Sequence, residues 1–185
     1  MEKKPIAYQI IRSARKTLAL EIRPDGTVLV RAPQRLSDRK IREFITARED
    51  WLRAHLKKYE NRPSLPRLTG QELQALAEQA KRELKARADF FAPQVGVTFG
   101  RITIRAQRTR WGSCSSQGNL NFNCLLMLAP EAIRDYVVVH ELCHRKEMNH
   151  SARFWAEVER ILPDYRARRQ WLKDNGTSLL ARLPE

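Results

Sequence analysis

The sequence lacks any long apolar run, and none of its hydrophobic stretches approaches the roughly 18 residues of a membrane-spanning helix. We therefore expect no membrane span and no membrane partner. Residues 1–5 are not followed by an apolar segment, so no secretory signal is expected either. Aromatic residues are scarce, at 8% of the chain, and they do not alternate with the basic clusters. This scarcity argues against a surface on which the bases of a single-stranded nucleic acid would stack.

Cysteine is also scarce. The chain has three, Cys114, Cys124 and Cys143, and an odd number is poorly suited to a disulfide framework. We therefore predict a protein of the reducing cytoplasm. A length of 185 residues is enough for one domain, or two small ones, with a buried core.

Basic residues are in excess, and the formal net charge is +14. Residues 1–68 contain 17 Lys and Arg against 8 Asp and Glu, whereas residues 69–185 contain 18 against 13. A basic surface attracts nucleic acid, nucleotides or acidic proteins, but it is also common on soluble proteins without such partners. A nucleic-acid partner is therefore possible but weakly supported.

The first third of the chain is predicted to begin with a β-hairpin. Apolar residues alternate in 17–22 and recur in 27–31, on either side of the turn sequence Pro24-Asp25-Gly26. An earlier strand is expected around residues 7–11. These strands are the β part of an N-terminal hairpin-and-helix portion.

A helix and a linker are expected to follow the hairpin. Ser37 is a typical helix N-cap, and apolar residues with a helical period continue to near Glu60. The next residues, 61–67, contain two prolines and no periodicity, which is typical of a linker. We therefore divide the chain into residues 1–62 and a catalytic portion, residues 69–185, which we expect to form one compact unit together.

The catalytic portion is predicted to contain two strands among several helices. Thr69 and Glu72 have the spacing of a capping box at the start of a long helix. The other expected elements are that helix to about Phe91, strands at 98–107 and 118–126, a helix from Pro130 to Asn149, a helix capped by Ser151, and a last helix from Pro163 to Asn175-Gly176.

Three of the four histidines fall within residues 140–150. On a helix, His140 and His144 project from one face, and Glu141 lies about 60° round the helix from His144. If the chain turns after His144, His150 completes a set of three ligands and leaves a fourth position for water, as in a catalytic zinc site.

An accidental H-E-x-x-H match is the alternative interpretation. The preceding residues, Ile133 and 136–139, are nearly all apolar, which indicates a buried helix. Polar side chains on such a helix are costly unless they have partners. We therefore favour a metal site with His140, His144 and His150 as ligands.

The Gly-, Ser- and Asn-rich stretch 110–123 lies between the two expected strands, just before the helix of the histidines. A sheet edge beside a metal can pair with an extended peptide backbone, and residues 120–124 are our candidate for that edge. A long hairpin loop with Trp111 as a packing anchor is an equal alternative.

Other side chains are assigned structural places. Cys143 points away from His144 and is expected in the core, and Cys114 is treated as a small buried residue rather than a reactive thiol. His55 has no acidic or cysteine neighbour at ligand spacing and is expected on the surface. A hydrophobic floor beneath the metal is expected from Met148, Phe154 and Trp155.

These segments together resemble the YgjP-like family of zinc metallopeptidases, and the resemblance covers nearly the whole chain. It implies a compact zincin-like α+β fold, with His140, His144 and His150 binding zinc and Glu141 acting as general base. The segments that carry it are Arg110-Trp111-Gly112-Ser113-Cys114-Ser115, Gly118-Asn119-Leu120-Asn121-Phe122-Asn123, Tyr136 to His144, Asn149-His150-Ser151 with Phe154-Trp155, and the hairpin Leu20 to Gly26.

The main hypothesis is a zinc-dependent hydrolase that cleaves peptide bonds in a peptide or protein substrate. Zinc would lower the pKa of its water toward about 7, and Glu141 would take the proton and later pass it to the leaving amine. Three imidazoles accept several divalent metals, so another ion is compatible with the same site.

Two other functions remain open. The first is hydrolysis of nucleotide phosphoanhydrides by the same metal, with arginines such as Arg108 and Arg110 binding phosphate, because the chain has no P-loop. The second is a non-catalytic zinc module that binds nucleic acid through its basic N-terminal portion.

Overall fold

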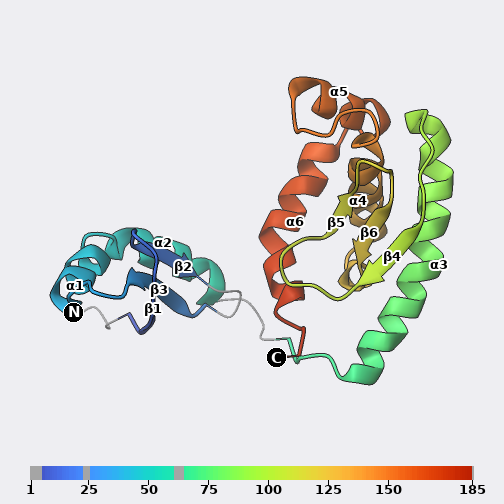
Figure 1. Ribbon diagram of the computed structural model, residues 1–185. Helices are drawn as coiled ribbons and strands as arrows, with labels where there is room; N and C mark the ends of the chain where they lie inside the picture. The colour runs from blue at the N-terminus through green and yellow to red at the C-terminus, as the bar shows by residue number, and fades with distance from the viewer. Residues whose placement is uncertain (1–5, 23–25, 61–64, 185) are drawn as a thin grey trace. The chain divides into compact units, whose positions relative to one another are not determined.

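The computed structural model describes residues 6–22, 26–60 and 65–184, and Figure 1 shows the order of the helices and strands. The chain divides into two compact units, residues 1–65 and 66–185, and each is described by itself. The predicted turn at Pro24-Asp25 and residues 61–64 of the predicted linker lie outside the described residues. The joining of the predicted portions, 1–62 and 69–185, into one compact unit stays a prediction.

The first unit contains a three-stranded sheet and two helices. The sheet has the order β1-β3-β2, in which β2 and β3 form the predicted antiparallel pair and β1 runs parallel to β3. Its elements are β1 (Tyr8–Ser13), β2 (Ala19–Ile22), β3 (Val28–Pro33), α1 (Asp38–Thr46) and α2 (Glu49–Glu60). Its core is formed by Val28, Val30, Ala32, Ile41, Ile45 and Leu52.

The single helix predicted from Ser37 to Glu60 is wrong, because the chain forms two helices with a break at Ala47 and Arg48. In a continuous helix the amide of Arg48 would donate to the carbonyl of Phe44. Instead the amide donates to Ile45, and the Arg48 guanidinium donates to the Phe44 carbonyl while lying 3.8 Å above the Phe44 ring. The predicted N-cap is confirmed, since the Ser37 side chain accepts from Lys40.

The second unit places a small mixed sheet against helices. The sheet has the order β4-β6-β5, with β4 parallel and β5 antiparallel to the central strand β6. In Figure 1, α3 and α6 flank α4 and the sheet lies across it. The elements are α3 (Gly70–Val95), β4 (Ile102–Arg105), β5 (Gly112–Cys114), β6 (Leu120–Asn123), the 3-10 helix η1 (Cys124–Leu128), α4 (Glu131–Cys143), α5 (Ala152–Ile161) and α6 (Tyr165–Leu180).

Both ends of the second unit are tied together. The amide of Leu68 donates to the carbonyl of Arg182 at 2.8 Å, and the Arg182 guanidinium donates to the carbonyl of Pro66 at 3.0 Å. The helix α3 then begins at the predicted capping box, in which Thr69 and Glu72 exchange both hydrogen bonds. It ends at Gly96, whose φ of 81° is the left-handed conformation common after a helix.

Two predicted helix ends are wrong. The histidine helix α4 ends at Cys143 rather than Asn149, and no described residue other than glycine has a positive φ. The Asn149 side chain instead accepts from the amide of Ser151 in a tight turn. The last helix continues through Gly176, because this glycine serves packing rather than termination: a Cβ there would lie 3.1 Å from the Trp111 ring.

Candidate metal centre

The helix α4 carries two of the candidate ligands on a buried segment. Residues 136–139, directly before His140, are all buried, as the apolar run predicts. The neighbouring helix α3 fixes α4 through Arg87, whose guanidinium donates to both carboxylate oxygens of Asp135 and also to Glu131. A rigid, buried helix thus presents His140 and Glu141 in its last turn.

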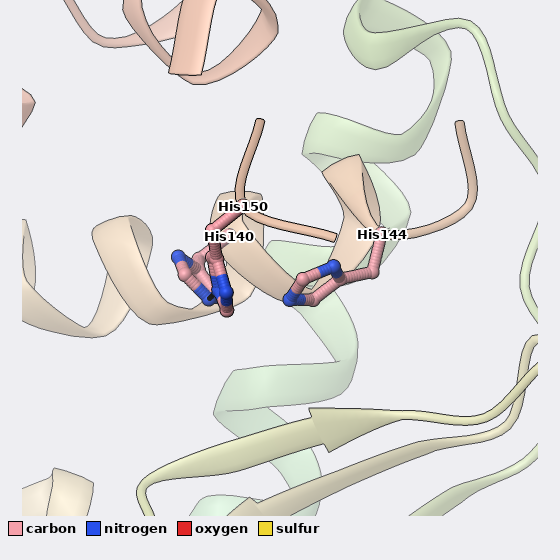
Figure 2. Close-up of side chains that lie close together, drawn as sticks. All are labelled: His140, His144 and His150. Carbon is pink, nitrogen blue, oxygen red and sulfur yellow. Dashed lines mark hydrogen bonds between the residues drawn. The ribbon is translucent and has the colours of Figure 1, made fainter. Parts of the chain in front are cut away.

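The structure brings the three predicted histidines together. Figure 2 shows their rings turned toward one another, with His140 and His144 from the end of α4 and His150 from the segment after it. The Nε2 atoms of His140 and His150 are 3.0 Å apart. One nitrogen from each of the three rings lies within 4.8 Å of the others, so the cluster could hold a metal ion.

The environment keeps two of these rings neutral. Burial, followed by the neighbouring His144 and His150, lowers the pKa of His140 to about 3. Burial also lowers the pKa of His144. The Nδ1 atom of His144 lies 3.0 Å from the carbonyl of Glu147, which suits a donated proton and leaves Nε2 as the atom with a lone pair.

Aromatic rings from the first turn of α5 surround the third histidine. The ring centre of His150 lies 4.8 Å from that of Phe154 and 5.6 Å from that of Trp155, which stacks on it. Phe154 is fully buried and also contacts His140 and His144. Ser151 caps α5 by accepting from the amide of Phe154. The orientation of His150 therefore depends on how α5 begins.

Glu141 lies in the same pocket as the histidines. It is buried, with 5% of its surface exposed, and burial raises its pKa to about 8, with the charge of Arg110 acting in the opposite direction. The carboxylate fits only because residue 112 is a glycine, since a Cβ there would lie 2.6 Å from Glu141 Oε1. Together with the three histidines, Ser113, Cys114 and Met148, these two residues line a cavity of about 240 Å³.

The sheet edge beside the site is not the one that we predicted. Residues 120–123 form β6, the central strand, and Leu120, Phe122 and Asn123 are fully buried. The edge strand that lines the cavity is β5, Gly112–Cys114, which belongs to the stretch that the sequence showed only as Gly- and Ser-rich. The alternative prediction, a hairpin loop with Trp111 as a packing anchor, is correct for Trp111, which packs against the core of the second unit.

Cys143 lies in the core as predicted, whereas the prediction that Cys114 is buried is wrong. Cys143 is fully buried, and burial raises the pKa of its thiol to about 12. Cys114 is only half-buried and lines the cavity, and burial, followed by the charge of Glu141, raises its pKa. His55 lies in α2 of the first unit and stacks on Trp51 with ring centres 4.1 Å apart.

No role at the site was predicted from the sequence for several residues that lie near it. Tyr136 lies one helical turn before His140, with ring centres 5.8 Å apart, and this spacing would have revealed it. The guanidinium of Arg169 lies 4.5 Å above the Trp155 ring, but no local pattern connects residue 169 with the histidines. Arg145 donates to the carbonyls of Thr98 and Ser116 and so holds the loop after β5.

The donor set fits a divalent metal ion. Two imidazole Nε2 atoms at 3.0 Å face each other, so they cannot both carry a proton, and a shared cation satisfies both lone pairs. The Nδ1 atom of His140 is buried and has no hydrogen-bond partner among the described residues. A buried ring with unsatisfied polar atoms is costly without a further partner.

A comparison with protein families decides the relationship. Residues 16–75 and 66–175 match the family described as YgjP-like, metallopeptidase domain. The chain belongs to the YgjP-like family. The resemblance that the motifs indicated is thus confirmed, and the helices and two small sheets of the described residues agree with the α+β class that it implied.

Two solved structures are similar to part of this YgjP-like chain. The metallopeptidase zymogen abylysin of Pyrococcus abyssi is 23% identical over 55% of this chain and 99% of its own, with a TM-score of 0.46. The metallopeptidase zymogen jannalysin of Methanocaldococcus jannaschii is 21% identical over 49% of this chain and 91% of its own, with a TM-score of 0.42. No curated protein sequence matches the chain.

Membership of the family gives the activity class. The protein is a metallopeptidase, and the prediction of a metal-dependent hydrolase is confirmed. The family does not favour the alternatives of a nucleotide hydrolase or a nucleic-acid-binding module. Among the described residues, no helix is both long and apolar enough to cross a membrane.

Proposed function

We propose that the protein is a zinc-dependent peptidase in which His140, His144 and His150 hold the ion and Glu141 moves the proton. The observation that carries the proposal is the convergence of three imidazole nitrogens within 4.8 Å beside a buried carboxylate. Two of the rings are kept neutral, which is the form that binds a metal. Zinc is the ion most often bound by three imidazoles with an open fourth position.

The metal and the carboxylate have separate tasks. A bound zinc ion supplies a Lewis acid that makes water acidic near neutral pH and polarises a peptide carbonyl. A cation beside Glu141 would lower the pKa of its carboxyl group and favour the ionised form, which would accept a proton from the attacking water and return it to the nitrogen of the leaving amine. The backbone of Gly112 lies against one side of this carboxylate and limits the access of bulk water from that side.

The edge strand β5 is suited to bind the substrate backbone. It lies at the outside of the sheet, pairs with β6 on one side, and lines the cavity of the histidines through Gly112, Ser113 and Cys114. An extended peptide that pairs with a free strand edge gains main-chain hydrogen bonds regardless of its sequence. We therefore place the scissile peptide along β5, and the substrate class is a peptide or protein.

The first prediction concerns Glu141→Gln. This variant keeps the size of the side chain and the three histidines but cannot accept a proton. We expect it to bind one zinc ion as the wild type does and to lose at least about a hundredfold in kcat. Metal content by mass spectrometry and hydrolysis of unfolded casein by the full chain give the two measurements.

His140→Ala is the matched variant, because it should lose both zinc and activity. Wild-type activity in Glu141→Gln would remove this carboxylate from the mechanism. If His140→Ala binds zinc with unchanged affinity, the histidine cluster is not the zinc site. If wild-type protein releases phosphate or diphosphate from nucleoside triphosphates and leaves peptides intact, the proposed substrate class is wrong.

A further inference from the structure

Arg169 is a cation next to the candidate site that no carboxylate neutralises among the described residues. It lies in α6, is exposed, and rests on Trp155, with its guanidinium carbon 4.5 Å from the ring centre. Trp155 in turn stacks on His150, and its ring centre is 5.8 Å from that of His140. One aromatic ring therefore separates Arg169 from two of the three candidate ligands.

The neighbouring arginines of the second unit are engaged differently. Arg168, the preceding residue, forms an ion pair with Asp164 at 2.9 Å and donates to the carbonyl of Ala132. Arg160 is paired with Glu157, and Arg134 with Glu83. Arg169 has the contact with the Trp155 ring instead, which orients the side chain and leaves its N–H donors free for a ligand.

The surroundings of the site favour a negative ligand. Among the described residues, Glu141 is the only acidic side chain that lines the cavity. A metal ion would add further positive charge.

We propose that Arg169 binds a carboxylate of the substrate, so that the protein prefers peptides with a carboxylate close to the cleaved bond. The planar guanidinium matches a carboxylate with two parallel hydrogen bonds, and Trp155 keeps it in place. Either a free C-terminus or an Asp or Glu side chain supplies this group. The inference rests on the proposed function, since it names the substrate class of the same site.

The experiment uses one peptide that the zinc-loaded full chain cleaves, made in four versions. Two versions carry a free C-terminal carboxylate or its amide, and two carry Glu or Gln beside the cleaved bond. For at least one pair we expect kcat/KM to be about tenfold or more higher with the carboxylate, as a hydrogen bond to a charged group implies. The pair that shows the preference identifies the source of the carboxylate.

Arg169→Gln should abolish this preference, bringing the ratio within each pair close to one. Arg169→Lys keeps the charge but loses the planar fork, so we expect an intermediate ratio. Arg82→Gln is the control, because Arg82 is an exposed arginine of α3 and its loss changes the net charge equally. It should keep the wild-type ratio.

A binding measurement separates this inference from the proposed function. The four peptides are titrated into zinc-loaded Glu141→Gln protein with and without Arg169→Gln, and the ratio of the Kd values is compared. No cleavage by the wild type together with an Arg169-dependent binding ratio would overturn the proposed function and support only the binding of a peptide carboxylate by Arg169. Equal Kd and kcat/KM values within both pairs, or a preference that persists in Arg169→Gln, would overturn the inference.

Discussion

At the scale of single residues, the site depends on how closely the backbone of Gly112 approaches Glu141. The absent side chain of residue 112 leaves the space that the carboxylate occupies. The contact joins the strand that we propose binds the substrate to the carboxylate that we propose moves the proton. A change at residue 112 should therefore act on catalysis without touching the histidines.

The second prediction is that Gly112→Ala lowers kcat by between about tenfold and a hundredfold, because the added Cβ displaces the carboxylate by a large fraction of an ångström. A Cβ would lie 2.6, 2.8 and 2.9 Å from three atoms of the Glu141 side chain. Zinc affinity should stay at the wild-type value. The measurements are steady-state hydrolysis and a zinc titration.

Gly70→Ala provides the control for this substitution. Gly70 lies in the first turn of α3, and a Cβ there meets nothing within 4 Å. We expect unchanged kcat and, at most, a small gain in stability from the less flexible chain. Equal activity of both alanine variants would show that Glu141 tolerates the displacement.

The histidines and Gly112 differ in how far the sequence predicts them. His140 and His144 are four residues apart on one helix, so their proximity follows from helical geometry alone. The position of Gly112 beside Glu141 joins residues far apart in the chain, and no local rule contains it. The same reason explains why Arg169, which reaches the site from α6, was not singled out.

At the scale of elements, the start of α5 sets the position of the third histidine. His150 is exposed and belongs to no helix or strand, so its own segment provides little support. Phe154 and Trp155 provide that support through ring contacts on two sides. Of the three residues predicted to form a hydrophobic surface beneath the metal, Phe154 and Trp155 contact the histidine rings. Met148 lines the cavity, with 55% of its surface exposed.

The third prediction is that Trp155→Leu weakens zinc binding by about tenfold to a hundredfold, as the loss of an outer partner of a metal ligand does. The Kd should rise because His150 is no longer held in the orientation of the other rings. A competition titration against a coloured chelator measures it. Trp155→Phe keeps a smaller stacking surface, so its Kd for zinc should lie between those of the wild type and Trp155→Leu.

Trp51→Leu is the matched control, because Trp51 stacks on His55 in the first unit, which contains none of the predicted ligands. Its Kd for zinc should equal that of the wild type. If Trp155→Leu also keeps the wild-type Kd while remaining folded by circular dichroism, the stack on His150 has no part in holding the metal.

Local sequence signals predict some element boundaries correctly, whereas boundaries that depend on tertiary packing are missed. The capping box at Thr69 and Glu72 is a local signal, and it predicted the start of α3 correctly. The Asn175-Gly176 pair is a local signal for a helix end. In the structure, however, Gly176 leaves space for the ring of Trp111, the residue directly before β5. The strand β5, Gly112–Cys114, has no alternating apolar residues that would indicate a strand, so the sequence predicted the edge at β6 instead.

At the scale of the whole second unit, one carboxylate joins three helical segments. Glu157 in α5 accepts from Lys146, in the turn after α4, and from Arg160, each at 3.0 Å. Arg160 also donates to the carbonyls of Gln94 and Val95 at the end of α3. Hydrogen bonds from Lys146 and then Arg160 lower the pKa of Glu157 below its ordinary value of 4.5.

The fourth prediction follows from this lowered pKa. A carboxyl group that ionises more easily in the folded state stabilises the fold above its unfolded pKa, and this contribution is lost as the pH falls through the folded value. Glu157→Gln should lower the free energy of unfolding by about 1 kcal/mol at pH 7, where the carboxylate is charged. The difference from the wild type should shrink below a pH of about 4, as measured by urea unfolding at several pH values.

Glu159→Gln is the control on the same helix. Glu159 pairs with Arg166, and both side chains are largely exposed. Such a pair contributes less than about 0.5 kcal/mol, so this variant should resemble the wild type at pH 7. A stability loss in Glu157→Gln that is the same at pH 3 and pH 7 would contradict a role for the charge.

The hydrogen bonds that join residues 66–68 to Arg182 have a mechanical consequence. They bring the beginning and the end of the second unit side by side. A force applied between these two ends therefore acts on the hydrogen bonds between residues 66–68 and Arg182 before it acts on α4. We therefore expect the second unit to tolerate insertion into a loop of another protein, with both of its ends joined, better than a chain break between two of its helices.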